Sequence, residues 1–204
     1  LVAWLQAFVA AELRRHDADH TGKADYALEP SGASVLSTRC SETYSPSTRL
    51  EKIFNIPLYY SSYGPRTVIS RSSSSPLPGE CWAFKGGHGF LTVQLSHAIN
   101  VSSVSYEHIP IELSPTGAIV SAPKTLRFWA YQSVDDFTTR HELGVFEYDI
   151  APGASPLQEW TVQKPSPYAS TPIVELEVLA NHDAPFTCLY RLRVHGKLAQ
   201  VTAT

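Results

Sequence analysis

Apolar residues at the start of the chain recur at intervals of three and four. This spacing is that of one face of an α-helix, and Arg14 and Arg15 follow the last of these residues. We predict a helix within residues 1–24 whose apolar stripe must be buried somewhere, and packing on its own domain is one alternative. The stripe consists of Leu1, Trp4, Leu5, Phe8, Val9 and Leu13.

From Ala33 onward the pattern changes to an alternation of apolar and polar residues, which is typical of half-buried antiparallel strands. In one such run, Val174 and Leu176 would face the core while Glu175 and Glu177 face solvent. The predicted strands lie at 91–96, 125–131, 145–150, 174–178 and 188–194.

Tracts rich in Pro, Gly and Ser separate these runs and predict turns. Many short strands divided in this way favour an all-β fold, an antiparallel β-sandwich. The turn tracts lie at 72–79, 110–123, 152–156 and 164–172.

Residues 44–64 interrupt this rhythm because aromatic and aliphatic side chains gather there around Pro46 and Pro57. They predict an exposed apolar flap, with an ordinary hairpin lying on the core as the alternative. The flap residues are Tyr44, Leu50, Ile53, Phe54, Ile56, Leu58, Tyr59 and Tyr60.

Composition narrows the possible partners. A chain of 204 residues forms one large domain or two small ones, and 16 basic against 19 acidic residues leave a net charge of -3. A chain with so little net charge has no overall electrostatic attraction to nucleic acid or anionic membranes, so a partner must be recognised by a local site.

No run approaches the roughly 20 apolar residues of a membrane span. Because the sequence opens mid-helix without Met, we expect a fragment whose membrane anchor, if any, lies upstream.

Three cysteines are an odd number, which in a secreted or lumenal protein points to one internal pair and one thiol left for another chain. Cys81 and Cys188 both lie in strand-like runs, and a bridge between them would leave Cys40 over. The alternative is a reduced protein with three buried thiols.

Catalytic and metal-binding patterns are weak. His16, Asp17, Asp19 and His20 could place two imidazoles one helical turn apart, but no further ligand is evident. The sequence has no Gly-x-Ser-x-Gly elbow, phosphate-binding glycine loop or His-Glu-x-x-His motif, and no carboxylate pair poised for hydrolysis. Asn100 begins a glycosylation sequon that a lumenal protein could use. We therefore expect no enzyme.

Three segments together resemble the SUN domain of nuclear-envelope bridging proteins, in the Sad1/UNC family. They are 37–44 (STRCSETY), 80–84 (ECWAF) and 186–196 (FTCLYRLRVHG), and the resemblance runs in order from about Asp25 to Gly196, which places the predicted domain at 25–204. The last segment and Tyr106-Glu107-His108 look most like nematode SUN proteins of nuclear migration. The resemblance implies a β-sandwich that follows a trimeric coiled coil, so residues 1–24 would end that stalk or fold back on the domain.

SUN domains bind the C-terminal tails of KASH proteins in the perinuclear lumen and so form a nucleo-cytoskeletal bridge, the LINC complex. The resemblance therefore implies an inner nuclear membrane protein, a homotrimer with a KASH peptide as partner and no nucleic acid. Because that lumen is oxidising, it favours the Cys81–Cys188 disulfide, and it assigns to Cys40 an intermolecular disulfide with the KASH peptide.

The resemblance also assigns the peptide site. His108, Ser121 and Tyr190 would donate hydrogen bonds to the terminal carboxylate of the peptide, and Gly89 would let the peptide end approach closely. Phe186 stands where the family often has Tyr, so one hydroxyl is missing. From the residues alone, the three donors would be ordinary structural polar groups.

Two further features follow from the resemblance. Residues 44–64 would be a hairpin lid that adds the peptide as a strand. The loop from Val68 to Glu80 would wrap a potassium ion with backbone carbonyls. From the sandwich architecture alone, a carbohydrate-binding module that uses exposed Trp129 or Trp160 is the competing interpretation.

Overall fold

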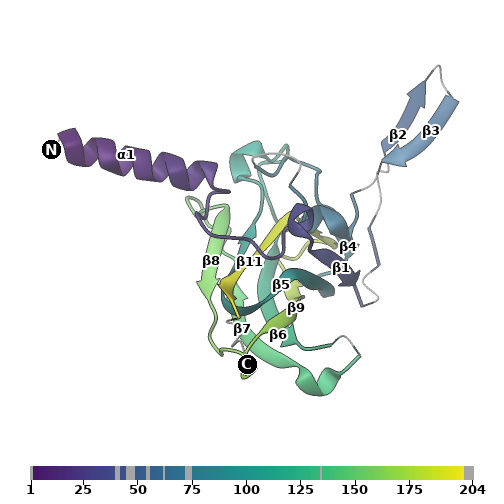
Figure 1. Cartoon of the computed structure of the whole chain (residues 1–204). Helices are drawn as coiled ribbons and strands as arrows, with labels where there is room; N and C mark the ends of the chain where they lie inside the picture. The colour runs from purple at the N-terminus through teal and green to yellow at the C-terminus, as the bar shows by residue number, and fades with distance from the viewer. Residues whose placement is uncertain are drawn as a thin grey trace.

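The computed structural model describes residues 2–39, 42–44, 49–53, 56–61, 63–71, 75–133 and 135–199. Its helical elements are α1 (Val2–Asp17) and four short 3-10 turns, η1 (Glu29–Ser31), η2 (Pro65–Val68), η3 (Ile111–Leu113) and η4 (Phe137–Thr139). Its strands are β1 (Ser34–Ser37), β2 (Arg49–Ile53), β3 (Ile56–Ser61), β4 (Trp82–Lys85), β5 (Gly89–Glu107), β6 (Pro123–Tyr131), β7 (His141–Glu147), β8 (Leu157–Thr161), β9 (Thr171–Asn181), β10 (Phe186–Leu189) and β11 (Arg191–Leu198). The predicted antiparallel β-sandwich is confirmed (Figure 1).

Strand β5 organises the sandwich. Its first half pairs with β1 and β9, and its second half pairs with β11 and β8. Between the halves the register shifts at Gln94 and Ile99, and His97 and Ala98 are exposed there. A bent 19-residue strand thus carries the chain from one set of partners to the other. Strands β6 and β7 extend the sheet beyond β9, while β4 and β10 form a separate two-stranded piece.

Alternating side chains from these strands fill one large apolar core. Trp82, Phe84, Leu91, Phe128 and Leu176 are among its fully buried members. One predicted strand is misplaced: β7 covers His141–Glu147, so it begins earlier than 145–150 and leaves 148–150 outside the strand. Tyr148 is nevertheless buried, and its hydroxyl donates to the carbonyl oxygen of Pro156.

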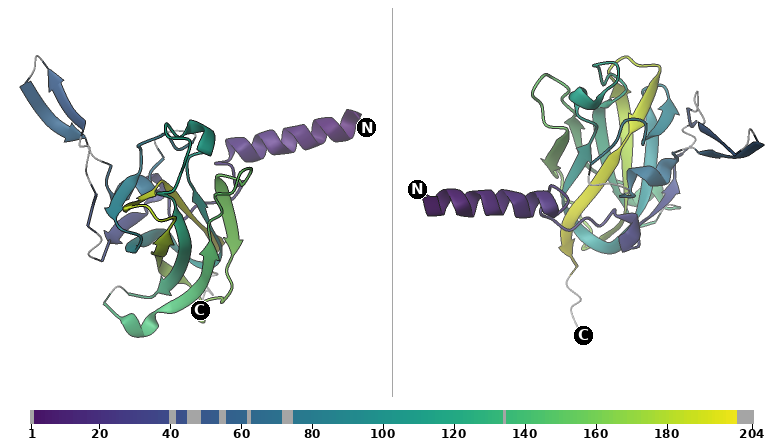
Figure 2. Two further views of the ribbon diagram at one scale, coloured as in Figure 1. Left: turned by 180° about the vertical axis from the view of Figure 1, so that it is seen from behind. Right: turned by 90° about the horizontal axis from the view of Figure 1, so that it is seen from above.

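Helix α1 stands away from the sandwich instead of lying on it (Figures 1 and 2). Trp4, Leu5 and Phe8 are 66%, 53% and 51% exposed, so the apolar stripe is real but uncovered within this chain. The structure therefore does not support the alternative in which the helix packs on its own domain. None of the helices in the described part of the chain is long and apolar enough to cross a membrane.

The polar segment after α1 is fastened to the sandwich although the helix is not. The carboxylate of Asp25 accepts from the backbone N–H groups of Ala27 and Val194, and it pairs with Arg191. The ring of His195 donates from Nδ1 to the Ala24 carbonyl oxygen at 2.8 Å and lies 3.1 Å from the hydroxyl of Ser105. The buried Ser105 and His195 thereby attach Ala24, just after the helix, to the sandwich.

The predicted flap is a hairpin. Strands β2 and β3 pair with each other in antiparallel fashion, with Leu50 opposite Tyr60 and Ile53 opposite Ile56. The hairpin projects from the sandwich, which contradicts the alternative in which it lies on the core (Figure 1). Phe54 lies outside the described residues.

Candidate functional site

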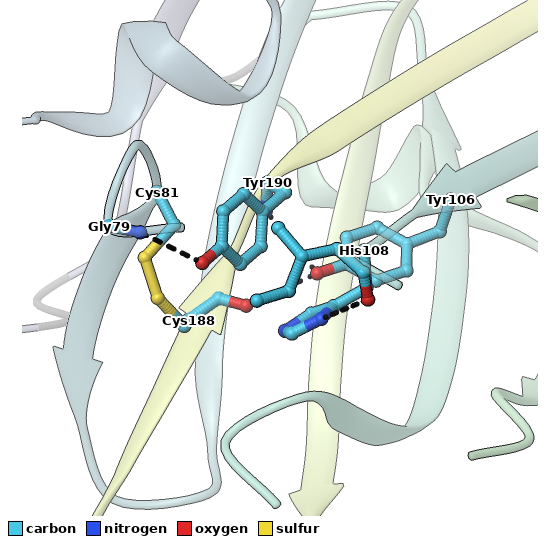
Figure 3. Close-up of a disulfide and its surroundings, with 7 residues drawn as sticks. Gly79, Cys81, Tyr106, His108, Cys188 and Tyr190 are labelled. Carbon is cyan, nitrogen blue, oxygen red and sulfur yellow. Dashed lines mark hydrogen bonds between the residues drawn. A yellow bond between two sulfur atoms is a disulfide. The ribbon is translucent and has the colours of Figure 1, made fainter. Parts of the chain in front are cut away.

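The predicted carboxylate pocket begins with a contact between two aromatic rings. His108 follows the end of β5 and Tyr190 lies between β10 and β11. Their ring centroids are 4.6 Å apart in an edge-to-face arrangement (Figure 3). Both residues are almost fully buried. Residues 82 positions apart in the sequence thus meet because β5 and β11 are paired along their length.

The disulfide between Cys81 and Cys188 fixes one side of this pocket (Figure 3). It confirms the predicted pairing, with a Cα–Cα distance of 5.6 Å. The backbone N–H of Cys188 donates to the carbonyl oxygen of Ser121 at 2.9 Å, so the half-buried Ser121 lies beside the bridge. The buried hydroxyl of Tyr106 donates to the Cys188 carbonyl and accepts from the N–H of Tyr190. The structure therefore brings His108, Ser121 and Tyr190 to one place.

Tyr190 also connects the pocket to the loop that follows Val68. The backbone N–H of Gly79 donates to its hydroxyl oxygen at 3.2 Å, which leaves the hydroxyl proton free to be donated elsewhere. Burial raises the pKa of Tyr190, so the hydroxyl keeps its proton at neutral pH. A small cavity under this loop is lined by polar and charged residues, among them Thr67, Ser70 and Glu80. Residues 72–74 of the loop lie outside the described residues, and the potassium site stays a prediction.

His108 is neutral in this environment. Its pKa is lowered from 6.5 to about 4, chiefly by burial and to a smaller extent by the nearby His182. Nδ1 of the ring lies 3.4 Å from the carbonyl oxygen of Ile109, and Nε2 has no hydrogen-bond partner among the described residues. A buried imidazole nitrogen without a partner is a place where a ligand can bind.

Phe186 and Tyr44 lie next to this group. Their rings stack with centroids 4.8 Å apart, and Phe186 packs against the small apolar cluster around Cys81, Cys188 and Tyr190. Tyr44 is held by its backbone N–H, which donates to the carbonyl oxygen of Ala83. The base of the hairpin segment is thereby fixed beside the pocket.

Gly89 has a packing role in the structure. A Cβ at this position would lie 2.6 Å from the ring of Phe84, so a larger residue would collide with the core. The close approach of a peptide end to Gly89 stays a prediction. Cys40, assigned to an intermolecular disulfide, lies outside the described residues.

Glu175 and Glu177 correct the sequence analysis, because they are 1% and 8% exposed and do not face solvent. The carboxylate of Glu175 accepts from the hydroxyls of Thr92 and Tyr131 and pairs with Arg39 and Arg140. This face of β9 is therefore covered by polar groups from distant segments. Alternation gives the direction of a side chain but not what lies on top of it.

Glu177 closes the same cluster around Trp129. Burial tends to raise the pKa of Glu177, but hydrogen bonds from Trp129 and His88 and nearby guanidinium groups lower it overall. The guanidinium of Arg140 lies 3.7 Å from the ring centroid of Trp129, and Trp160 stacks on Phe146 at 5.5 Å. Each tryptophan has a face covered by another side chain of this chain. The two residues are therefore poorly suited as stacking platforms for a sugar.

A second buried charge network was also missed. Arg193 is 2% exposed and donates to both Asp19 and Glu107, while the neighbouring Arg191 pairs with Asp25. Burial works to raise the pKa of Asp19, and the arginines lower it overall. Arg191 and Arg193 occupy alternate positions on one strand, and acidic residues follow the helix, but sequence alone does not join them.

The histidines at the end of α1 contact each other, with ring centroids 4.5 Å apart. Asp19 turns away from them toward Arg193. In the part of the chain that the structure describes, no group of three or more His, Cys, Asp and Glu side chains is arranged to hold a metal ion.

Comparison with known proteins decides the family. Residues 58–198 match the Sad1/UNC-like C-terminal family, which is more than half of the chain. The chain belongs to the Sad1/UNC family, whose conserved module is the SUN domain. This SUN domain is 53% identical over 197 residues to the nuclear migration and anchoring protein unc-84 of Caenorhabditis elegans. It is 45% identical over 197 residues to the human SUN domain-containing protein 1.

These matches cover 97% and 96% of this SUN domain but only 18% and 24% of the two relatives. Among solved structures, a family 32 carbohydrate-binding module from Streptococcus pneumoniae EndoD superposes with a TM-score of 0.57. It is 13% identical, and the match covers 85% of this chain and all of that one. That likeness shows the sandwich fold alone.

Proposed function

We propose that this SUN domain captures the C-terminal tail of KASH proteins and so forms one end of a nucleo-cytoskeletal bridge. The observation that carries the proposal is the convergence of His108, Ser121 and Tyr190 beside the disulfide. Polar side chains gathered in a nearly dry pocket suit a terminal carboxylate, because the charge-assisted hydrogen bonds that it accepts are the strong ones. The buried rings of His108 and Tyr190 exclude water around it.

The projecting hairpin supplies the second half of the proposed site. A paired hairpin with a free edge can accept an extended peptide as a further strand, so that backbone hydrogen bonds give affinity. The stacked Tyr44 and Phe186 lie where the hairpin segment reaches the pocket. The peptide would run from the hairpin to the carboxylate pocket.

We propose further that the domain works as a homotrimer at the inner nuclear membrane, with residues 1–24 as the end of a stalk and 25–204 in the perinuclear lumen. The uncovered stripe of α1 supports assembly, since exposed leucine, tryptophan and phenylalanine on one helix face favour packing with other helices. The relationship to a nuclear migration and anchoring protein supports a role in nuclear positioning.

The intramolecular disulfide supports the proposed role of Cys40 and the lumenal location. It uses two of the three cysteines and leaves Cys40 for a bond to the peptide. Mass spectrometry of a non-reduced complex with a cysteine-bearing peptide would show the cross-linked mass. Only uncross-linked species would contradict this role.

Calorimetric titration with a synthetic KASH-type peptide tests the main proposal. A peptide with a free terminal carboxylate should bind, and the same peptide extended by one residue should not. Tyr190→Phe should weaken binding about tenfold by removing one charge-assisted donor. Tyr168→Phe, in the loop before β9, is the matched control and should leave binding unchanged. Equal binding of both peptides would refute carboxylate capture.

A further inference from the structure

Two buried imidazole nitrogens at the edge of the pocket have no hydrogen-bond partner among the described residues. They are Nε2 of His108 and Nε2 of His182. Leaving such an atom buried and unpaired costs free energy, so its presence in a folded protein calls for an explanation. His182, in the loop after β9, was not among the residues that the sequence pointed to.

Hydrogen bonds at the other ring nitrogens determine what these atoms can do. Nδ1 of His108 lies against the carbonyl oxygen of Ile109. The ring of His182 likewise hydrogen-bonds to the backbone of Tyr148. Since a carbonyl oxygen only accepts, the single proton of each neutral ring lies on Nδ1. Both unpaired Nε2 atoms are then acceptors. An acceptor repels a carboxylate unless it first takes up a proton.

Strand pairing places Asn181, the residue before His182, opposite Pro123 near Ser121, and its side chain donates to the carbonyl oxygen of Phe186. Tyr148 contacts both histidines. The ring of Tyr148 lies 6.4 Å from that of His108, and its backbone bonds His182. The remaining titratable or charged groups that face the pair come from several elements. Tyr106 and Tyr190 lie against His108, Glu107 acts on Tyr106 and Tyr148, and Lys124, Asp149 and Asp183 act on His182.

Most of these groups cannot change the charge of the site near neutral pH. Burial raises the pKa values of Tyr106, Tyr148 and Tyr190, so all three hydroxyls stay protonated. Glu107 is already paired with Arg193 at 2.6 Å. The two imidazoles are the groups that can take up a proton when an anion arrives.

We propose that His182 is a second imidazole of the carboxylate site and that the peptide terminus binds together with one proton taken up from solvent by the His108–His182 pair. This inference rests on the proposed capture of a terminal carboxylate. The added proton converts an unpaired acceptor into a charged donor facing the carboxylate, and the proton belongs to the pair. Affinity then rises as the pH falls, by up to about tenfold per pH unit for one linked proton.

The test is calorimetry of the whole 204-residue chain with the free-carboxylate KASH-type peptide and its C-terminally amidated form. Titrations at pH 7.5, 6.8 and 6.0 are repeated in buffers of different ionisation enthalpy, because the change in heat between buffers counts the protons taken up. We expect uptake approaching one proton at pH 6.8 and tighter binding at pH 6.0 for the free carboxylate. The amide should take up none.

His182→Asn removes the second imidazole, and His97→Asn, at the exposed bend of β5, is the matched control. We expect His182→Asn to weaken binding at pH 6.0 about tenfold and to reduce the proton uptake, while His97→Asn leaves both unchanged. Thermal unfolding of each variant verifies that it is folded.

The outcomes separate the two proposals. If the amide binds as well as the free carboxylate, or neither binds, the proposed capture of the carboxylate fails. If the free carboxylate is preferred but the heats do not depend on the buffer, capture stands and the proton linkage is overturned. If uptake occurs but His182→Asn behaves as His97→Asn does, the assignment of His182 is overturned.

Discussion

Replacing His108 with Phe should make the folded domain less sensitive to acid. In the folded protein burial lowers the pKa of His108 from 6.5 to about 4, so the ring stays neutral where the unfolded chain is protonated. At pH 5 nearly every His108 of the unfolded chain carries a proton, whereas about nine-tenths of the folded rings do not. Phe keeps an aromatic ring between Tyr106 and Tyr190 but cannot titrate.

The sign and size follow from proton linkage. Folding lowers the pKa of His108, so the folded protein keeps its full stability at pH values above 6.5, the pKa in the unfolded chain. The free energy of unfolding then falls as the pH drops from 6.5 toward 4. Between pH 7.5 and pH 5 the loss from His108 alone is about 2 kcal/mol. Carboxylates with lowered pKa values, such as Asp19 and Glu177, lose their contribution only at lower pH.

Urea unfolding at pH 7.5 and pH 5 measures the effect. The free energy of unfolding of the wild-type chain should fall by about 2 kcal/mol more than that of His108→Phe over this interval. The exposed His97 gives the matched control, and His97→Phe should retain the wild-type acid sensitivity. Equal losses for the wild type and His108→Phe would refute the argument that the buried ring stays neutral.

Three further changes have defined outcomes. Replacing Cys81 and Cys188 with Ala opens a loop of 107 residues and should cost about 4 to 5 kcal/mol in denaturant unfolding, an effect that reductant reproduces in the wild type. Gly89→Ala puts a methyl group against Phe84 and should cost about 1 to 3 kcal/mol in the same assay, and full stability would contradict the predicted clash. Arg193→Met removes the arginine partner of the buried Glu107 and leaves Asp19 with only its longer contacts to Arg71 and Arg191, so it should lower stability by about 3 to 5 kcal/mol at pH 7; a change below 1 kcal/mol would mean that the network is solvated.

The apolar stripe of α1 predicts self-association. Deleting residues 1–17 should lower the mass measured by light scattering if the stripe assembles the chain, because the exposed Trp4 and Phe8 would no longer be present to pack between helices. An unchanged mass would exclude the helix from oligomeric control.

Sequence reasoning was most reliable where the information is local. The alternation of β5 and β9 and the turn-rich tracts at 110–123, 152–156 and 164–172 each involve a few adjacent residues, and the structure confirms them. The three motif segments were enough to place the chain in its family. The Cys81–Cys188 pairing needed the resemblance as well, because spacing alone left a reduced protein open.

The errors concern what covers a surface. Alternation correctly turned Glu175 and Glu177 away from the core but could not reveal that Arg39, Arg140 and Trp129 lie over them. The intervals of three and four residues predicted the apolar stripe of α1, but they could not show that the sandwich leaves the stripe uncovered.

The sequence by itself determined the family, the sandwich and the direction in which most strand side chains point, because these depend on neighbours in the chain. Only the tertiary structure decided which side chains share an environment: Tyr190 against His108, and Arg193 between Asp19 and Glu107. The charge state of a buried group depends on such neighbours, since desolvation and contact with other charges act through space and not along the chain.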